Sequence, residues 1–186
     1  MLIPKEICDQ LEDEEMVALA LKNMDYYNCI VLRFNDKLFN YVKRISGAND
    51  QEIEDVLQES FIKIWTNLNG YRKGLKLSSW VYRITHNVAV SRWRKSKTAK
   101  DVFTKGVEDI IKMNYSKYEE PGLDEEMMKE VLSELKPKYR EVLILKYFEA
   151  LSYEEISDIL KIPEGTVAVR INRAKKILRN VLEARP

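Results

Sequence analysis

Apolar side chains recur at steps of three and four residues along most of this 186-residue chain, which is the spacing of amphipathic helices. The first such pattern runs over residues 14–45 and ends at a Gly-Ala-Asn-Asp break. A second pattern covers 53–68. A third covers 80–97, behind Ser78 or Ser79, either of which can cap a helix by accepting bonds from its free N–H groups. The first half of the chain is therefore predicted to be helical.

The C-terminal third of the chain returns to this helical spacing. Helices are expected at 124–135, from Pro137 onward, at 153–160 and at 164–182. Pro137 suits a first turn, where its missing N–H is not needed, and Ser152 with Glu155 three residues later is a capping box. Since no segment alternates with the two-residue period of a strand, the predicted fold class is all-α.

The regular period is lost between these two helical parts. Residues 96–122 mix Lys, Thr, Asp, Asn and Ser and end in Glu-Glu-Pro-Gly, a composition typical of a flexible linker, with a short helical turn expected at 107–113. The chain is thus predicted to hold one small domain over 1–95 and a second over 123–186. The second ends in a helix, a short turn and a helix, which is the spacing of a helix-turn-helix.

The formal net charge of +1 hides a strong segregation of charge along the chain. Residues 1–59 contain 13 acidic and 6 basic residues. Residues 60–100 contain 10 basic residues and no acidic one. Residues 101–186 contain 17 acidic and 15 basic residues. Acidic and basic surfaces attract different partners. The pattern therefore predicts an acidic surface for one partner and a basic surface for another.

The residues needed for an active site are scarce. Cys8 and Cys29 have no CxxC spacing, and His86 is the single histidine, so a zinc site would lack ligands and a Cys-His nucleophile would lack its base. The sequence also shows no clustered metal-binding carboxylates and no phosphate loop. We expect buried free thiols, no catalytic residue, no metal and no cofactor.

Targeting signals are not evident in the sequence. No apolar run approaches the roughly 20 residues that a membrane span needs, and the N-terminus lacks the charged-then-apolar order of a secretory signal. A cytoplasmic protein without membrane insertion is expected, and thiols stay reduced in that compartment.

One candidate binding surface lies on the helix at 164–182. Its core-facing stripe is predicted to include Val167, Ile171 and Ala174. The row opposite that stripe consists of Thr166, Val169, Arg170 and Arg173, and Lys176 flanks it as a further DNA-binding candidate. Arginine can donate to the two acceptors of guanine in the major groove, and Lys and Arg side chains further along the helix can bind phosphates. The alternative is a solvated basic helix that only packs on its neighbours.

A second candidate surface lies on the helix at 80–97. Its core-facing stripe is predicted to be Val81, Ile84, Val88 and Ser91. The candidates for contact with separated DNA strands lie before that helix and on its other side: Lys76, Tyr82, Arg83, His86, Asn87, Trp93 and Arg94. Basic groups attract phosphates, and flat rings stack on unpaired bases. The alternative is that the tryptophans only pack, which is favoured for Trp80 and stays open for Trp93.

A third candidate surface lies on the helix that begins near Gln51. Four residues stand at i, i+3, i+4 and i+7: Asp55, Gln58, Glu59 and Ile62. Such a mixed acidic and apolar row suits docking on a basic protein helix. Acids in a first turn also complement the helix dipole, which would explain Asp55 without a partner but not the continuation to Ile62.

Together these segments resemble the extracytoplasmic-function sigma factors, the smallest class of bacterial sigma factor. The likeness is carried by Asp55-Val-Leu-Gln-Glu-Ser-Phe-Ile-Lys-Ile-Trp65, Ser79-Trp-Val-Tyr-Arg-Ile-Thr-His-Asn-Val-Ala89, Leu151-Ser-Tyr-Glu-Glu-Ile-Ser157, Ile162-Pro-Glu-Gly-Thr-Val167 and Arg170-Ile-Asn-Arg-Ala-Lys175. It covers roughly residues 14–95 and 124–182. Each motif alone is common, whereas all of them in this order are highly specific.

The resemblance implies two helical domains, sigma region two and sigma region four, and no catalytic site. The Asp55–Ile62 row would dock on the clamp helices of the largest subunit of core RNA polymerase, and region four on the flap of the second largest. The loop 71–79 and the helix 80–95 would read the minus-ten promoter element and capture a flipped base. The helix 164–179 would read the minus-thirty-five element, and an anti-sigma factor is the implied regulator.

Two positions depart from the family pattern. Val169 stands where a small polar residue is common, which favours contact with a thymine methyl group. The loop before Trp80 reads Lys73-Gly-Leu-Lys-Leu and not a Gly-rich run. The identity of the flipped base is therefore not carried over.

Two competing hypotheses belong to other functional classes. A stand-alone helix-turn-helix regulator would need a dimerisation surface and leaves the Asp55–Ile62 row unexplained. A nucleic-acid-processing enzyme would need the catalytic groups described above, and this sequence lacks them. The favoured hypothesis is a sigma factor that binds core RNA polymerase and directs promoter recognition and melting.

Overall fold

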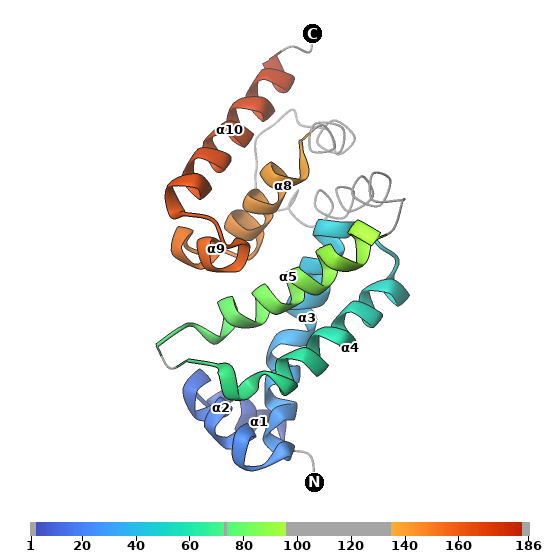
Figure 1. Ribbon diagram of the computed structural model, residues 1–186, viewed down its shortest axis with the longest axis vertical. Coiled ribbons are helices and arrows are strands. Elements are labelled where there is room, and N and C mark those ends of the chain that lie inside the picture. The colour runs from blue at the N-terminus through green and yellow to red at the C-terminus, as the bar shows by residue number, and fades with distance from the viewer. Residues whose placement is uncertain (1–2, 73, 96–134, 184–186) are drawn as a thin grey trace.

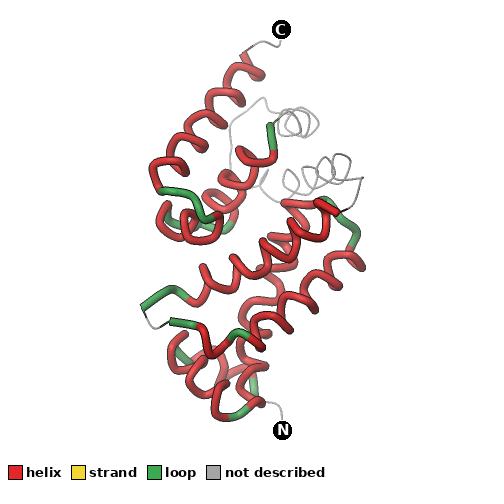
Figure 2. Tube along the Cα trace, viewed as in Figure 1, coloured by secondary structure: helices red, strands yellow, loops and turns green. Residues whose placement is uncertain are grey.

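The computed structural model describes residues 3–72, 74–95 and 135–183, and every regular element within those ranges is helical (Figures 1 and 2). The predicted all-α class is thereby confirmed for the described part of the chain. The expected linker at 96–122, its turn at 107–113 and the helix expected at 124–135 lie outside the described residues, Leu135 excepted.

The helices form two groups in chain order. The first group comprises α1 (Lys5–Gln10), α2 (Asp13–Lys22), the 3-10 turn η1 (Met24–Tyr26), α3 (Tyr27–Ser46), α4 (Asp50–Thr66), the 3-10 turn η2 (Leu68–Gly70) and α5 (Leu77–Lys95). The second group comprises α8 (Pro137–Leu143), the π-helical turn η3 (Ile144–Phe148), α9 (Tyr153–Leu160) and α10 (Glu164–Glu183). The two groups touch where α9 lies against α5 (Figure 1).

The apolar pattern over residues 14–45 is interrupted at Asn23. Its backbone is extended, and its side chain accepts a bond from the N–H of Asp25 at 3.0 Å. Asparagine favours such local bonds to the backbone, which compete with helix propagation. The chain therefore leaves α2 at this point and re-enters helix as η1 and α3.

Helices α4 and α5 begin in different ways. Asn49 caps α4 by accepting a bond from the N–H of Glu52 at 3.0 Å, and the Glu52 side chain accepts one in return at 3.3 Å. The serine cap predicted for α5 is wrong, because the N–H of Trp80 already bonds to the carbonyl of Lys76 and the helix begins at Leu77. Both serines lie inside its first turn.

The helix ends predicted for the second group are confirmed. Pro137 occupies the start of α8. Ser152 accepts a bond from the N–H of Glu155 at 3.2 Å, and Glu155 accepts one from the N–H of Ser152 at 2.7 Å. The turn between α9 and α10 places Lys161 in the left-handed region, at φ 53°. A helix, a short turn and a helix thus follow one another as the helix-turn-helix spacing predicts.

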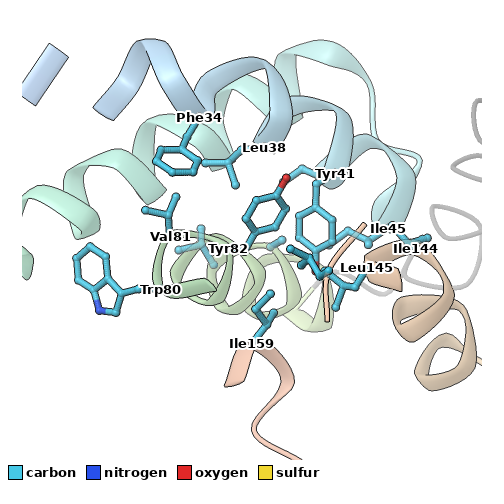
Figure 3. Packing of buried hydrophobic residues seen from close by; sticks show 14 of the residues in the cluster. Phe34, Leu38, Tyr41, Ile45, Trp80, Val81, Tyr82, Ile144, Leu145 and Ile159 are labelled. Atoms are coloured by element: carbon cyan, nitrogen blue, oxygen red, sulfur yellow. The ribbon is translucent and has the colours of Figure 1, made fainter. Parts of the chain in front are cut away.

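The core of the first group is built around α3. Its buried side chains Phe34, Leu38 and Tyr41 face α5, from which Val81 and Tyr82 point back (Figure 3). Burying one large apolar side chain contributes about 1.5–3 kcal/mol. The same cluster continues into η3 and α9, so the two groups of helices share one apolar core.

Helix α5 is buried on more sides than the sequence predicts. Three residues expected to face outward are buried, with exposed fractions of 3, 8 and 4% for Tyr82, His86 and Trp93. The expectation was wrong because α5 packs on α3 and α4 and also on α9, and a helix with several neighbours needs apolar side chains around most of its circumference. The expected core stripe is only partly buried, since Ser91 at its end is exposed.

The packing role favoured for Trp80 agrees with its burial. Its indole is largely buried and lies edge-on to the ring of Tyr71, with the ring centroids 5.8 Å apart. Such edge-to-face pairs add about 0.5–1.5 kcal/mol beyond area burial. The ring therefore anchors the segment between η2 and α5.

The two cysteines are paired, which corrects the expectation of free thiols. Both side chains are buried as expected, but Cys8 and Cys29 form a disulfide that joins α1 to α3. Arg33 reinforces this junction, since its guanidinium donates to the carbonyls of Cys8 and Leu11 at 2.7 and 2.6 Å. Spacing alone did not predict the pair, because 21 residues separate the cysteines and only the turn back of α3 brings them together.

The described residues contain neither a membrane-spanning helix nor a cluster of metal-binding side chains. None of the helices there is both long and apolar enough to cross a membrane. No three His, Cys, Asp or Glu side chains in the same ranges gather closely enough to hold a metal ion.

His86 and Tyr41 form a buried polar pair in the core. The Tyr41 hydroxyl and Nδ1 of His86 share a hydrogen bond of 2.8 Å. Burial lowers the pKa of His86 from 6.5 to about 4, because the charged imidazolium would lose its hydration. The neutral ring is therefore the form that the fold holds at pH 7.

This shift predicts a loss of stability in acid. Below about pH 6.5, His86 binds a proton in the unfolded chain but not in the folded chain. The free energy of unfolding therefore falls as the pH drops from about 6.5 to about 4, by up to about 3 kcal/mol. We expect the His86→Gln variant to lack this decline, measured by urea unfolding at several pH values. Asn87→Gln, an exposed neighbour, is the control and should follow the wild-type slope. A His86→Gln profile parallel to wild type would contradict the assignment.

Candidate nucleic-acid and protein interfaces

The row predicted on α4 lies at the surface. Gln58, Glu59 and Ile62 are exposed, and Asp55 is half-buried. Ile62 leaves 63% of its surface open to solvent, the second-largest fraction among the exposed large apolar residues of the described ranges. A solvent-facing apolar side chain beside carboxylates is the arrangement expected of a docking surface that lacks its partner.

Two surface ion pairs belong to this row. Asp55 accepts a bond from Arg92 of α5 at 2.7 Å, and Glu59 pairs with Lys63 one turn later at 2.7 Å. Exposed pairs of this kind contribute little to stability, typically about 0–1 kcal/mol. Both carboxylates can therefore exchange these bonds for contacts with a basic partner at small cost.

A cleft of about 540 Å³ opens between the end of α4 and the middle of α5. Its polar lining comes from Lys63, Thr66, Asn67, Arg83, Asn87 and Ser91, and its apolar lining from Trp80, Ile84 and Val88. Two of the residues predicted to contact minus-ten DNA, Arg83 and Asn87, thus come together here. Lys63 and Thr66 of α4 and Asn67, which follows the helix, were not predicted, because the helical pattern alone did not show which turn of α4 faces α5.

The lining of this cleft suits a nucleotide better than an apolar ligand. Lys63 and Arg83 supply cations for a phosphate, and Asn67 and Asn87 supply amides that both donate and accept hydrogen bonds. The side of Trp80 gives a flat apolar wall. The mixture can therefore hold a base edge and the charged backbone attached to it.

The other predicted minus-ten residues lie elsewhere. Tyr82, His86 and Trp93 are buried in the core and away from solvent. Lys76 is exposed and pairs with Glu155 of α9 at 3.2 Å. The side chain of Arg94 lies outside the described residues.

The predicted core stripe of α10 is buried, and its predicted DNA-binding row lies on the other side of the helix. Val167, Ile171 and Ala174 are fully buried against α8 and α9. The predicted DNA-binding row shares the other side, with Val169, Arg173 and Lys176 exposed and Thr166 and Arg170 half-buried. The helix therefore presents a basic face that carries one apolar side chain.

Two basic side chains of α10 contact neighbouring tyrosines. Lys175 lies over the ring of Tyr147, with its ammonium 5.2 Å from the centroid. Arg173 hydrogen-bonds the hydroxyl of Tyr139 and lowers the pKa of that phenol. Such contacts restrict long side chains that would otherwise lose entropy on binding phosphate.

Arg170 lies near a carboxylate of α8. Burial raises the pKa of Glu141 to about 7, and the positive charges of Arg170 and Arg140 act against that rise. Glu141 is therefore about half ionised at pH 7, and Arg170 lies close enough to favour its charged form. This arginine was predicted from the helical row alone, and its acidic neighbour was not.

Comparison with known families matches both groups of helices. The Sigma-70 region 2 family matches residues 30–98, and the Sigma-70 region 4 family matches residues 125–178. The cleft and the α4 row fall in the first match, and the α10 row falls in the second. A stand-alone helix-turn-helix regulator is not favoured, because it would leave the first match unexplained.

Curated relatives extend this likeness over nearly the whole chain. The ECF RNA polymerase sigma factor SigW of Bacillus subtilis (strain 168) is 34% identical over 186 residues, which span 91% of this chain and 98% of the relative. The ECF RNA polymerase sigma-E factor of Escherichia coli (strain K12) is 30% identical over 187 residues, spanning 94% and 96%.

Two solved structures share the fold. CnrH, in complex with the cytosolic domain of CnrY, superposes with a TM-score of 0.67 at 21% identity and covers 92% of this chain and 97% of its own. The sigma factor RpoE of Bartonella quintana, in complex with the anti-sigma factor NepR, gives a TM-score of 0.61 at 21% identity over 86% and 98%. With matches to both sigma regions in order and to full-length relatives, the chain belongs to the extracytoplasmic-function family of RNA polymerase sigma factors.

Proposed function

We propose that this sigma factor docks on core RNA polymerase through α4, captures an extruded promoter base in the α4–α5 cleft and reads upstream duplex with α10. One observation carries the proposal: the chain has three solvent-exposed surfaces of different chemistry. One is an acidic and apolar row on α4, one is a cleft with polar and cationic lining, and one is the basic face of α10. Each matches one of the tasks that promoter opening requires.

The row on α4 supports docking on the clamp helices of the polymerase's largest subunit. The exposed Ile62 supplies apolar area to bury, while Asp55 and Glu59 supply charge that steers a basic partner into register. The second group of helices would dock on the flap of the second-largest subunit. Two attachments raise the effective concentration of each for its site.

The cleft supports capture of a minus-ten base. Extruding one base from duplex DNA costs a few kcal/mol, which a site must offset with stacking and hydrogen bonds. In the cleft the proposed contacts are Arg83 and Lys63 to phosphate and Asn87 to the base edge. We assign Tyr82, His86 and Trp93 to packing and not to direct contact, because they are buried.

The face of α10 supports readout of the minus-thirty-five element. Arg170 would hydrogen-bond guanine in the major groove, and Val169 would touch a thymine methyl group. Arg173 and Lys176 lie further along the face and would hold phosphates, which position the helix without reading sequence. Thr166 begins the face at the helix N-terminus.

Regulation and location follow from the same assignment. The two similar solved structures are complexes, one with the cytosolic domain of CnrY and one with the anti-sigma factor NepR. They support an anti-sigma factor as a partner of this chain as well. Work with polymerase on promoter DNA further supports action in the cytoplasm, a reducing compartment in which the Cys8–Cys29 disulfide would be open to reduction.

Charge reversal tests the docking surface. The double variant Asp55→Lys, Glu59→Lys should abolish co-migration with core polymerase in gel filtration and lower run-off transcription at least about tenfold, because like charges would then face each other. The fold should survive, since both native ion pairs are exposed. The control Asp9→Lys, Asp36→Lys makes the same change in net charge on other exposed helices. Normal transcription by the first variant would contradict the docking assignment.

Truncation of Asn87 tests the cleft. On duplex promoters Asn87→Ala should lower the permanganate reactivity of unpaired minus-ten thymines, about tenfold at limiting sigma factor, because the captured base loses a partner. A template with a preformed minus-ten bubble should restore activity, since the cost of opening is already met. Asn69→Ala, exposed and outside the cleft, is the matched control. An equal defect on duplex and bubble templates would remove the cleft from the melting step.

Truncation of Arg170 tests base readout by α10. Arg170→Ala should weaken binding of holoenzyme to the best promoter by about 1–3 kcal/mol and relax its preference at one base pair. Lys176→Ala should instead weaken all promoters alike and reduce the salt dependence of binding. Competition binding against promoters with each upstream base pair replaced separates the two. Uniform weakening by Arg170→Ala would reassign Arg170 to phosphate.

A further inference from the structure

A short turn lies between η2 and α5. Its ends are joined by a bond of 3.3 Å from the N–H of Leu75 to the carbonyl of Arg72. Gly74, the third residue of this turn, lies in the left-handed region at φ 89°, a conformation that favours glycine at the third position of a turn. The turn's own bond uses the N–H of its fourth residue, so the N–H of Gly74 is left for another acceptor.

That acceptor lies on α2, 60 residues earlier in the chain. The carboxylate of Glu14 accepts the N–H of Gly74 at 3.1 Å. A bond to an ionised acceptor is roughly twice as strong as one between neutral groups. Helix α2 also packs against η2. It therefore contacts this part of the chain both before the turn and within it.

The turn is joined to the wall of the cleft. Gly70, at the end of η2, and Trp80, near the start of α5, both line the cleft. The ring of Tyr71 packs edge-on against Trp80, and the Tyr71 hydroxyl donates to the carbonyl of Leu75. Tyr71 thus links the turn to the indole. A displacement of the turn would therefore reach a side chain that forms the cleft.

Helix α2 is anchored at the end that carries Glu14. Arg33 of α3 donates to the carboxylate of Asp13 at 2.9 Å. The same guanidinium bonds the carbonyls of Cys8 and Leu11, which precede α2. An acceptor that is already held in place loses little entropy when it binds its donor. The anchored helix therefore makes Glu14 a fixed point for the turn.

The helix dipole alone does not explain Glu14. Asp13, Glu14 and Glu15 all lie in the first turn of α2, where a carboxylate complements the dipole. That contribution is shared by the three acidic residues, whereas the bond to Gly74 belongs to Glu14. A carboxylate near a DNA site also repels phosphates. A task within the protein therefore suits Glu14 better than contact with DNA.

We infer that Glu14 is a positioning residue for minus-ten recognition: it holds Gly74 and thereby fixes the turn and the indole wall of the cleft that receives the extruded base. The inference rests on the proposed function of the cleft. Glu14 acts through the backbone of the turn and touches neither the base nor its phosphates. Loss of its bond lets the turn and Trp80 shift, so that different bases fit the cleft with similar affinity. Its effect is therefore on selectivity at a minus-ten position and not on the fold.

Competition between duplex promoters that differ at single minus-ten base pairs tests this role in the holoenzyme. Glu14→Ala should reduce the preference for the best base at one minus-ten position about fivefold, the size expected for one hydrogen bond, and leave the preference at upstream positions unchanged. Glu14→Gln retains an oxygen acceptor on a side chain of the same length and should keep most of the wild-type preference. Glu15→Ala removes an acidic residue from the same helix turn and, as the matched control, should behave as wild type.

Measurements on the full chain separate positioning from general damage. Amide hydrogen exchange at Gly74, followed by NMR, should be several-fold faster in Glu14→Ala than in wild type and close to the wild-type rate in Glu14→Gln. The midpoint of urea unfolding and the affinity for core polymerase should equal those of Glu15→Ala.

Three results would overturn the positioning role. The first is a wild-type minus-ten preference in Glu14→Ala while Asn87→Ala shows its expected defect. The second is a Glu14→Gln variant as impaired as Glu14→Ala, and the third is an equal loss of preference at minus-ten and upstream positions. Normal promoter opening by Asn87→Ala would instead remove the cleft assignment, and the positioning role with it.

Discussion

The structure depends on the burial of α5 between two sets of helices. On one side α5 packs on α3 and α4, and on another it packs on α9 of the second group. Without the first contact the sigma region two core around Tyr41 would not form. Without the second, Tyr82 would lose its bond to Glu149 and its cover of apolar side chains. Because these neighbours take up most of its circumference, little of α5 remains for a ligand.

That remaining strip of α5 is where the cleft opens. Arg83 and Asn87 reach it from α5, and Lys63 and Asn67 reach it from the end of α4. The acidic residues of α4 lie earlier on the same helix, and the basic residues of α10 lie in the second group of helices. The charge segregation along the chain therefore becomes a segregation of surfaces. One partner can be protein and another DNA without either competing for the same side chains.

The sequence predicted the elements whose signals are local. Helix periods, the Ser152 capping box, Pro137 and the core stripe of α10 each depend on residues within a few turns, and the structure has all of them. The order of motifs also predicted the family, which the matches to both sigma regions confirm.

What the sequence could not supply depends on tertiary contacts. Tyr82, His86 and Trp93 have the composition of a stacking surface, yet they are buried because α3 and α9 both pack on α5. The pairing of Cys8 with Cys29 depends on how α3 folds back beside α1. Glu14 and Gly74, 60 residues apart, carry no motif at all. Each of these requires knowing which faces meet, and a single helical pattern does not contain that information.

If this chain belongs to an initiating holoenzyme, it should give core RNA polymerase the ability to find and open promoters. Run-off transcription with purified core polymerase, on a promoter library with randomised upstream and minus-ten segments, measures that ability. Adding the chain should yield transcripts from a small subset of templates, which share one sequence at each of two elements. Transcript yields and template preference identical to those of core polymerase alone would show that the chain does not act as an initiation factor.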